Sequence, residues 1–387
     1  MPRYVKLGDI PPKRHTQFRR PDGSLYSEQV FGAKGFSGIA SILYHTNPPT
    51  QVSRIQNPLH CAAADLEEMR SLRHRHLKTA GLALGQNPVT ERIPLMKNSD
   101  VQISIAGQSE SASPFYKNAD GDELLFIHEG EGILESQFGT LNYHAGDYLI
   151  IPRGVIYQLQ PAGGQNRILV IESYSPIEIP RRYRNEYGQL LEHAPFCERD
   201  IRVPENLQVH AEEGDFDVLI RSQGSLYTYT CPVHPFDTIG WDGYLYPWAL
   251  NILDFEPVTG SLHQPPPAHQ TFEAHNFVVC SFVPRMLDYH PLAVPAPYNH
   301  SNVDSDEMIY YVNGSFSSRK GIEKGSITLH PSGIPHGPHP GAVEGSLGKS
   351  RTDELAVMVD TFRPLKLVFD TAAIEDVNYY KSWNYVR

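Results

Sequence analysis

The chain has 387 residues, of which 40% are hydrophobic and 20% charged, as is ordinary for a soluble globular protein of two or three domains. A net charge of -11, a pI near 5.9 and the absence of a Lys/Arg-rich run argue against nucleic-acid and anionic-membrane partners. The four cysteines form no CxxC pair, and the sequence shows neither a signal peptide nor an 18-residue apolar run, so we expect a reduced, cytoplasmic protein.

In chain order, the first regular element that the sequence predicts is a helix over about residues 62–78, where apolar residues recur at helical spacing. Short apolar runs bounded by Gly and Pro follow over 101–175 and predict strands. A second, weaker helix is expected near 180–195, and strand-like runs return after about 205. Runs at intervals of eight to twelve residues indicate an antiparallel sandwich or barrel. We therefore predict a mainly β fold with a few short helices.

The two halves of the chain repeat one skeleton with an offset of about 180 residues. In each copy six residues separate a Glu from a Gly, and the pattern G-x5-P-x-G-x2 follows. The first copy begins at Glu123 and ends at Tyr157, whereas the second begins at Glu307 and ends at His336. The Gly and Pro positions are turn residues. The last position differs in chemistry, and this difference indicates that only one copy carries a functional site.

The second copy resembles a known metal-binding motif. PYNHSNVDSDEMIYYVNG contains H-x-N-x4-E-x6-G, formed by His300, Asn302, Glu307 and Gly314. GSITLHPSGIPHG contains G-x5-P-x-G-x2-H without change. Together they resemble the two-part cupin motif, in which the place of Asn302 is usually a histidine. The resemblance implies a bicupin, which consists of two tandem cupin-type (jelly-roll) β-barrels.

The second copy supplies two imidazoles and one carboxylate as candidate metal ligands, His300, Glu307 and His336. Three such ligands on one face of an octahedral ion leave three positions open and suit Fe(II), although Mn or Zn would also accept them. Asp306 competes with Glu307 as the carboxylate ligand. The spacing to the following glycine, which matches the upstream copy, favours Glu307.

The first copy has Asn118, Asp120 and Tyr157 where the motif has histidines, and it keeps only Glu123. One carboxylate without an imidazole is a poor Fe(II) site. We therefore predict a degenerate N-terminal cupin domain without metal over 1–205 and a catalytic C-terminal cupin domain with the Fe(II) site over 206–387. Whether the N-terminal barrel binds another ligand stays open.

Several further stretches resemble the homogentisate 1,2-dioxygenase family, bacterial type. They are KRHTQFRRPDGSLYSEQVFG, KNADGDELLFIHEGEG and HPFDTIGWDGYLYPWALNI, together with the metal segment. The resemblance spans nearly the whole chain. It implies an Fe(II)-dependent enzyme that cleaves a small aromatic acid, homogentisate, with O2 to maleylacetoacetate in tyrosine and phenylalanine catabolism. It also implies a homo-oligomer, either a trimer or a hexamer.

The resemblance assigns roles to individual residues. It implies that the iron ligands are His300, Glu307 and His336. It implies a histidine base on the substrate hydroxyl, best matched by His263, with His269 as a rival. The substrate contacts that it implies are Tyr298, His330 and His336.

Two departures leave the substrate open. Phe316 stands where the animal enzymes of the family have Tyr, and one extra residue separates His300 from Glu307. A related ring-cleaving dioxygenase acting on gentisate or 3-hydroxyanthranilate is therefore an alternative. A non-catalytic metal-binding bicupin is another alternative. A Zn or Mn sugar isomerase of the same fold is a third, although such isomerases usually have a further histidine ligand where this chain has Asn302.

Overall fold

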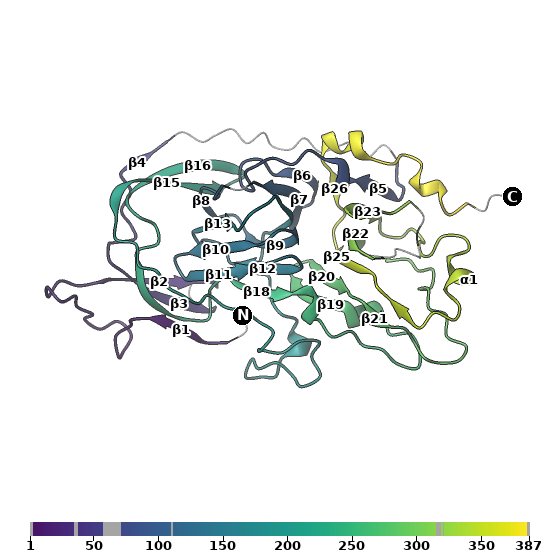
Figure 1. The fold of residues 1–387 in the computed structure, drawn as a ribbon, viewed down its shortest axis with the longest axis horizontal. Helices are drawn as coiled ribbons and strands as arrows, with labels where there is room; N and C mark the ends of the chain where they lie inside the picture. The colour runs from purple at the N-terminus through teal and green to yellow at the C-terminus, as the bar shows by residue number, and fades with distance from the viewer. Residues whose placement is uncertain are drawn as a thin grey trace.

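The computed structural model describes residues 3–34, 38–56, 71–109, 111–314, 319 and 321–384. Its regular structure is almost entirely β, as the sequence predicts, and the strands form two units along the long axis of the molecule (Figure 1). Phe316 and residues 62–70 of the first predicted helix lie outside the described residues.

The first unit contains two seven-stranded sheets. One has the order β18 (Trp248–Asn251), β12 (Asp147–Ile151), β9 (Asp122–Glu129), β14 (Asn166–Ser173), β7 (Val101–Gln108), β6 (Ile93–Lys97) and β26 (Lys366–Leu367). The other has the order β11 (Gly139–Tyr143), β10 (Gly132–Ser136), β13 (Tyr157–Pro161), β8 (Phe115–Asn118), β15 (Glu213–Ser222), β16 (Ser225–Val233) and β4 (Arg54–Ile55). The first of these sheets is buried on both faces, since every residue of β7 and β12 is buried.

Near the N-terminus a separate four-stranded sheet has the order β1 (Val5–Gly8), β17 (Thr238–Gly243), β3 (Ala40–His45) and β2 (Ser27–Gly32). The partner of both β1 and β3 is therefore a strand from the middle of the chain. This pairing fixes the N-terminal segment to the first unit.

The second unit has one large sheet, in the order β19 (Gln270–Ala274), β20 (Phe277–Phe282), β25 (Leu355–Thr361), β22 (Asp306–Asn313), β23 (Ser326–His330) and β5 (Arg75–Lys78). The only other named strands of this unit are β21 (Arg285–Met286) and β24 (Arg351–Thr352), within the described part of the chain. Loops make up much of the remaining wall.

Helical structure is sparse in the described ranges. The α-helix α1 spans Ala342–Ser346. The 3-10 helices span Thr79–Gly81, Arg181–Tyr183, Ile252–Asp254, Pro266–His269, Phe369–Ile374 and Tyr379–Lys381. The helix predicted near 180–195 is thus only a three-residue 3-10 turn.

The two large sheets have the same topology. The order β12-β9-β14-β7-β6 in the first matches β23-β22-β25-β20-β19 in the second, which places the two copies of the sequence repeat on equivalent strands. Each sheet takes its edge strand from the other half of the sequence, since β5 pairs with β23 and β18 pairs with β12. β15 and β16 also join the first unit although they follow residue 205. The predicted division at 205/206 therefore does not coincide with a division between sheets.

The C-terminal part of the helix predicted over 62–78 is wrong, because Arg75–Lys78 is strand β5. Three of its four residues are buried, and Leu77 has no exposed surface. Pairing with β23 satisfies the backbone of this segment and buries these side chains, so tertiary context overrides the local helical spacing.

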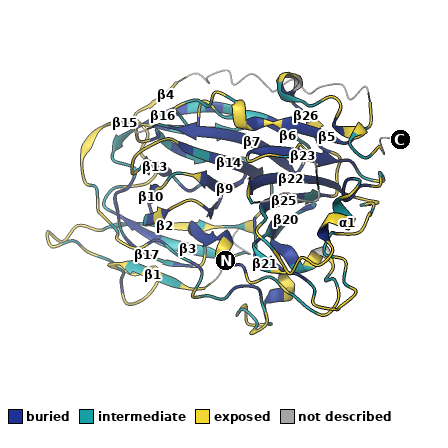
Figure 2. Ribbon diagram, turned by 45° about the vertical axis from the view of Figure 1, so that its right-hand side comes forward, coloured by how far each residue is buried: buried dark blue, intermediate teal, exposed yellow. Residues whose placement is uncertain are grey.

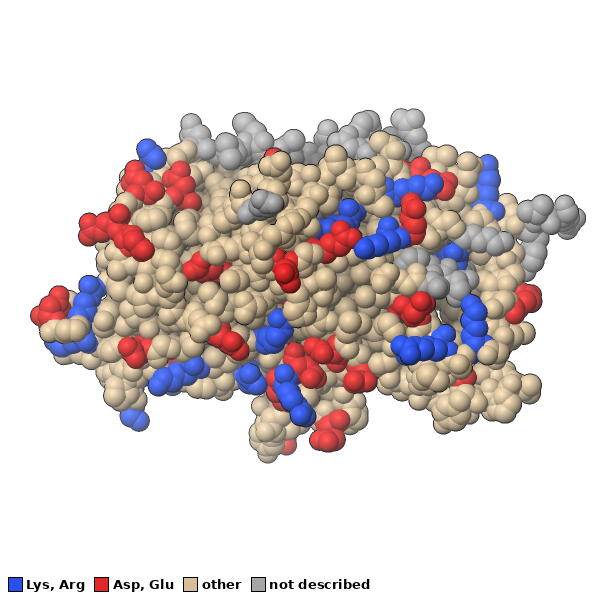
Figure 3. Space-filling model, viewed as in Figure 1, with Lys and Arg blue, Asp and Glu red and all other residues tan. Residues whose placement is uncertain are grey.

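The two units share one hydrophobic core, and the buried strands run through the centre of both (Figure 2). Polar contacts also join them: His128 Nε2 donates to the Val312 carbonyl at 3.1 Å, and the hydroxyls of Tyr148 and Ser281 are 2.8 Å apart. On the face in Figure 3 acidic and basic side chains are interspersed. None of the described helices is both long enough and apolar enough to cross a bilayer.

Candidate metal centre

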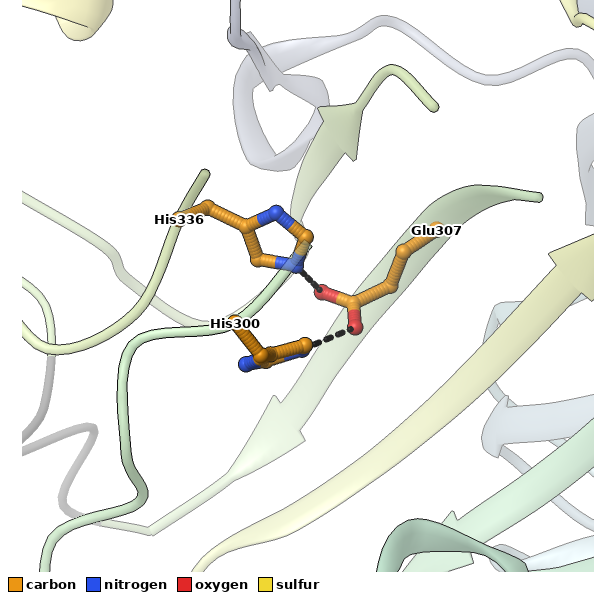
Figure 4. Close-up of side chains that lie close together, drawn as sticks. All are labelled: His300, Glu307 and His336. Atoms are coloured by element: carbon orange, nitrogen blue, oxygen red, sulfur yellow. Dashed lines mark ion pairs between the residues drawn. The ribbon is translucent and has the colours of Figure 1, made fainter. Parts of the chain in front are cut away.

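Three side chains from the second repeat converge at one point, as the sequence predicts. The candidate ligand atoms of His300, Glu307 and His336 all lie within 4.8 Å of one another. His300 Nε2 is 3.6 Å from Glu307 Oε2, and His336 Nε2 is 3.5 Å from Glu307 Oε1. Figure 4 shows both rings turned toward the carboxylate. Glu307 comes from β22, and the two histidines come from loops.

Backbone hydrogen bonds fix the two histidine loops to each other. The amide of His300 donates to the carbonyl of His336, and the reverse bond also forms, both at 2.8 Å. Each ring then uses Nδ1 locally, for His300 Nδ1 is 3.2 Å from the Tyr298 carbonyl and His336 Nδ1 is 3.1 Å from the Ile334 carbonyl. A carbonyl accepts only from N–H, so in the neutral form of each ring Nε2 carries a lone pair that a metal ion or a proton can take.

Glu307 is held from behind by His330. His330 has no exposed surface, and its Nδ1–H donates to Glu307 Oε1 at 2.7 Å. Its Nε2 accepts from the Arg319 guanidinium at 2.8 Å, and that guanidinium is also 3.6 Å from Glu307 Oε1. Burial and the nearby Arg319 hold the pKa of His330 well below its ordinary value, so the ring is neutral. This arrangement fixes one tautomer of His330 and one orientation of the carboxylate.

The electrostatics of Glu307 favour its charged form. Burial opposes the charge, but interactions with His300, His330 and His336 outweigh it and hold the pKa of Glu307 well below its ordinary value. The contact with Glu307 raises the pKa of His300 against the effect of burial. Glu307 is therefore an anion surrounded by imidazole nitrogen atoms.

Asp306, the rival carboxylate, has a structural role. Its Oδ1 accepts from the Ser332 amide and its Oδ2 accepts from the Leu365 amide, both at 2.8 Å. Asp122 in the first repeat does the same with the amides of Arg153 and Ile177, at 2.9 and 3.1 Å. In both repeats the first carboxylate thus ties two loops to the sheet, and only the second faces the centre.

The geometry fits a divalent metal ion. Nε2 of His336 is buried and has no hydrogen-bond partner among the residues that the structure describes, and an uncompensated buried nitrogen is costly unless something binds it. Two Nε2 lone pairs and one carboxylate are a donor set that Fe(II), Mn(II) and Zn(II) accept. These residues would hold the ion.

A cavity of about 450 Å³ lies near His300, since His263, Tyr298 and Asn299 line it, although neither His300 nor Glu307 is among its described lining residues. The rings of His263 and Tyr298 are 5.1 Å apart, and those of Tyr298 and His300 are 6.0 Å apart. His269, the rival of His263, is buried against Phe282 and does not line this cavity. His330 and His336 also lie outside the cavity lining, the former behind Glu307.

Sequence reasoning missed four residues around the centre: His74, Asp288, Arg319 and Asp360. His74 precedes β5 and bonds through Nε2 to the Pro335 carbonyl at 3.0 Å, next to His336. Asp360 is opposite Glu307 on β25, and burial, with Glu307 adding to the effect, raises its pKa to about 8. Only Asp360 had a signal in the sequence, because an acidic residue, Glu172, stands at the equivalent position of the first repeat. Glu172 pairs with Glu123 as Asp360 pairs with Glu307.

Comparison with known proteins agrees with this geometry. The family model described as homogentisate 1,2-dioxygenase N-terminal matches residues 95–252. A protein of Saccharolobus solfataricus named "Putative dioxygenase SSO1533" is 44% identical over 383 residues, which are 98% of each chain.

Two solved structures show a distant resemblance to the chain. A cupin 2 conserved barrel domain protein from Leptotrichia buccalis is 11% identical, with a TM-score of 0.33, over 78% of this chain and 100% of its own. A protein of Pseudomonas aeruginosa, titled as glyoxylate induced, is 14% identical, with a TM-score of 0.36, over 81% of this chain and 97% of its own. The near full-length relative and the matched family model are decisive: the chain belongs to the homogentisate 1,2-dioxygenase family.

Proposed function

We propose that this dioxygenase uses Fe(II) to cleave the ring of homogentisate, giving maleylacetoacetate. The observation that carries the proposal is the convergence of His300, Glu307 and His336 beside a cavity of substrate size. In this reaction one ring C–C bond breaks, and both atoms of O2 enter the product. The substrate supplies all the electrons, so no nicotinamide or flavin is required.

Within this proposal His300, Glu307 and His336 hold the ion and leave its other positions to substrate and O2. Bound Fe(II) would supply the electron path between the aromatic ring and O2. His330 and Arg319 keep the carboxylate of Glu307 in place, because one donates to it and the other fixes the donor.

His263 is suited to take a proton from the substrate hydroxyl. It lines the cavity, and its side chain is 29% exposed, so a substrate in the cavity reaches it. An imidazole nitrogen that a substrate hydroxyl can reach is a suitable proton acceptor. Tyr298, whose ring packs on His263, forms the wall between this base and His300.

The rest of the cavity is largely apolar. Its lining includes Leu262, Leu292, Val294 and Pro297. An apolar wall accepts the face of an aromatic ring and displaces water from the reacting atoms when the ring binds. The cavity volume of about 450 Å³ lies within the range of small-molecule sites.

Anaerobic loading with Fe(II), followed by measurement of oxygen uptake, tests the proposal. Homogentisate, gentisate and 3-hydroxyanthranilate are compared, with Mn(II)- and Zn(II)-loaded protein as metal controls. The proposal predicts the highest kcat/KM for homogentisate with Fe(II), and one O2 consumed per substrate. Preference for either of the other acids would transfer the assignment to that acid. No uptake with any of them would favour a non-catalytic metal-binding protein.

A further inference from the structure

The charges around the cavity are unusual for a site that binds an acid. Among the twelve described residues that line it, none is Lys or Arg, and the only carboxylate is Asp288. The side chain of Asp288 is 5% exposed, so it is almost fully removed from bulk water. The described wall of the cavity thus offers a hydrogen-bond acceptor to a ligand and no Lys or Arg to a second carboxylate.

Asp288 uses only one of its two oxygens within the described parts of the chain. Its Oδ2 is 3.6 Å from His263 Nδ1, whereas its Oδ1 is buried and has no hydrogen-bond partner there. A buried carboxylate oxygen without a donor is costly, since it has lost its bonds to water. A donor on the ligand would satisfy it.

Asp288 lies at the end of a row of contacts that leads away from the metal ligands. The row runs from His300 to Tyr298, from Tyr298 to His263 and from His263 to Asp288. A ligand anchored at His300 therefore passes the two aromatic side chains before it reaches Asp288. Asp288, which lines the cavity, is therefore the residue at the distal end of this row.

Arg285, a cation that interacts with Asp288, is set back from the cavity. Burial lowers the pKa of Arg285, and the field of Asp288 acts against this effect, which shows that the two charges interact. Arg285 does not line the cavity. It therefore moderates the negative charge of Asp288 and does not offer an anion site to a ligand.

We propose that Asp288 is a specificity residue that accepts a hydrogen bond from a hydroxyl at the distal end of the substrate ring. The substrate class is then a phenolic acid with its one carboxylate at the metal end and a second hydroxyl far from it. A second carboxylate at the distal end would face Asp288 without a cation and be excluded. This inference rests on the proposed function, because it assumes that an aromatic acid binds between the metal centre and Asp288.

The experiment uses two probes that differ by the distal hydroxyl alone. Fe(II)-loaded protein without O2 is titrated in a calorimeter with 2,5-dihydroxyphenylacetate and with 2-hydroxyphenylacetate. A hydrogen bond to a buried charge predicts that the first binds at least about tenfold more tightly. The readout is a dissociation constant, so it does not depend on turnover.

Two variants refine the result. Asp288→Ala should weaken the dihydroxy probe by about tenfold and leave the monohydroxy probe unchanged within about twofold. Glu344→Gln is the matched control, because Glu344 is an exposed carboxylate on α1 beside cavity residue Val343, and it should change neither constant. If Asp288→Ala does not fold, the ratio of the two wild-type constants decides.

The outcomes separate this inference from the proposed function. Equal affinity for both probes, in a protein that consumes O2 with homogentisate, would refute the role of Asp288 and leave the enzyme assignment intact. A preference for the dihydroxy probe that persists in Asp288→Ala would also refute it. Failure of both probes to bind, together with no oxygen uptake, would remove the proposed function and this inference with it.

Discussion

The two units of the molecule place a buried glutamate at the same point of the same sheet topology, yet they surround it differently. Glu123 receives the Arg92 guanidinium at 2.5 Å and the Tyr157 hydroxyl at 2.7 Å. Glu307 is surrounded by His300, His330 and His336. The first centre is closed by the guanidinium of Arg92, a cation that belongs to the chain itself. The second centre offers imidazole nitrogens to which an external cation could bind.

The opposite strand makes the contrast sharper. Glu172 is across from Glu123, and Asp360 is across from Glu307, so each centre holds two carboxyl groups. In the first unit Arg92 is 3.5 Å and Arg221 3.1 Å from Glu172. Oδ1 of Asp360 has no hydrogen-bond partner among the described residues. We infer that arginine side chains compensate the buried acidic groups of the first unit, whereas a metal ion would do so for Glu307 in the second.

The space around the two centres differs in the same sense as their charges. The hollow beside Arg92 and Tyr157 has no room for a water molecule, with a volume of about 0 Å³. The cavity beside Tyr298 has a volume of about 450 Å³. The first centre is thus filled by its own side chains. We infer that the first centre contributes to stability and that catalysis takes place at the second centre.

The largest expected effect comes from removing a ligand. His336→Ala should lose Fe(II) and reduce turnover by at least about a hundredfold, since it deletes one of three donors. Tyr157→Phe changes the equivalent position of the first unit and should keep both iron and activity. Metal analysis and oxygen uptake measure the pair. Iron retained in His336→Ala, or lost in Tyr157→Phe, would contradict the inference that only the second unit binds iron.

Removal of the internal cation should have the next largest effect. Arg92→Met leaves Glu123 and Glu172 buried without their main partner, which should lower the free energy of unfolding by about 3–5 kcal/mol. Urea denaturation measures this loss, with Arg3→Met as an exposed control. Added Fe(II) should not restore the stability. Full recovery with metal would mean that the first centre also binds an ion.

The contact between the units predicts a dependence of stability on pH. Burial, with a smaller effect of Lys324, lowers the pKa of His128 to about 4, so the folded protein favours the neutral ring. Stability from this group is complete above about pH 6.5 and is lost as the pH falls toward 4, by about 3 kcal/mol in total.

Denaturation curves between pH 4 and 7 for the wild type and His128→Gln test this prediction. The variant, neutral at every pH, should show a flatter dependence over this range. Equal slopes would show that His128 does not report on the contact between the units.

A smaller effect is expected behind the metal ligands. His330→Ala removes the donor to Glu307 and should weaken Fe(II) affinity by about 10–100-fold. His330→Asn keeps an N–H near the place of Nδ1 and should recover part of the loss. Competition with a metal-binding dye gives the affinities. Equal affinities in all three proteins would leave His330 with packing alone.

The sequence predicts the β class and the ligand triad because both rest on local spacing. Turn residues at fixed intervals bring His300, Glu307 and His336 together once the strands pair. The edge strand β5 was not predictable in this way, since its partner β23 is about 250 residues away and the local pattern favours a helix.

Arg319 and Asp288 were also missed, for a related reason. Neither belongs to the repeat, and their importance comes from burial next to His330 and His263, which only the folded chain creates. The first repeat therefore has no equivalent residues from which these two could have been predicted. Asp360 was missed as well, although Glu172 at the matching position of the first repeat was a signal for it.

The most direct test of the account is the number of Fe(II) ions bound per chain and the residue that controls it. Anaerobic reconstitution and metal analysis of the wild type, Glu307→Gln and Glu123→Gln should give one ion, none and one, respectively. Two ions in the wild type, or loss of the single ion in Glu123→Gln with Glu307→Gln unaffected, would contradict it.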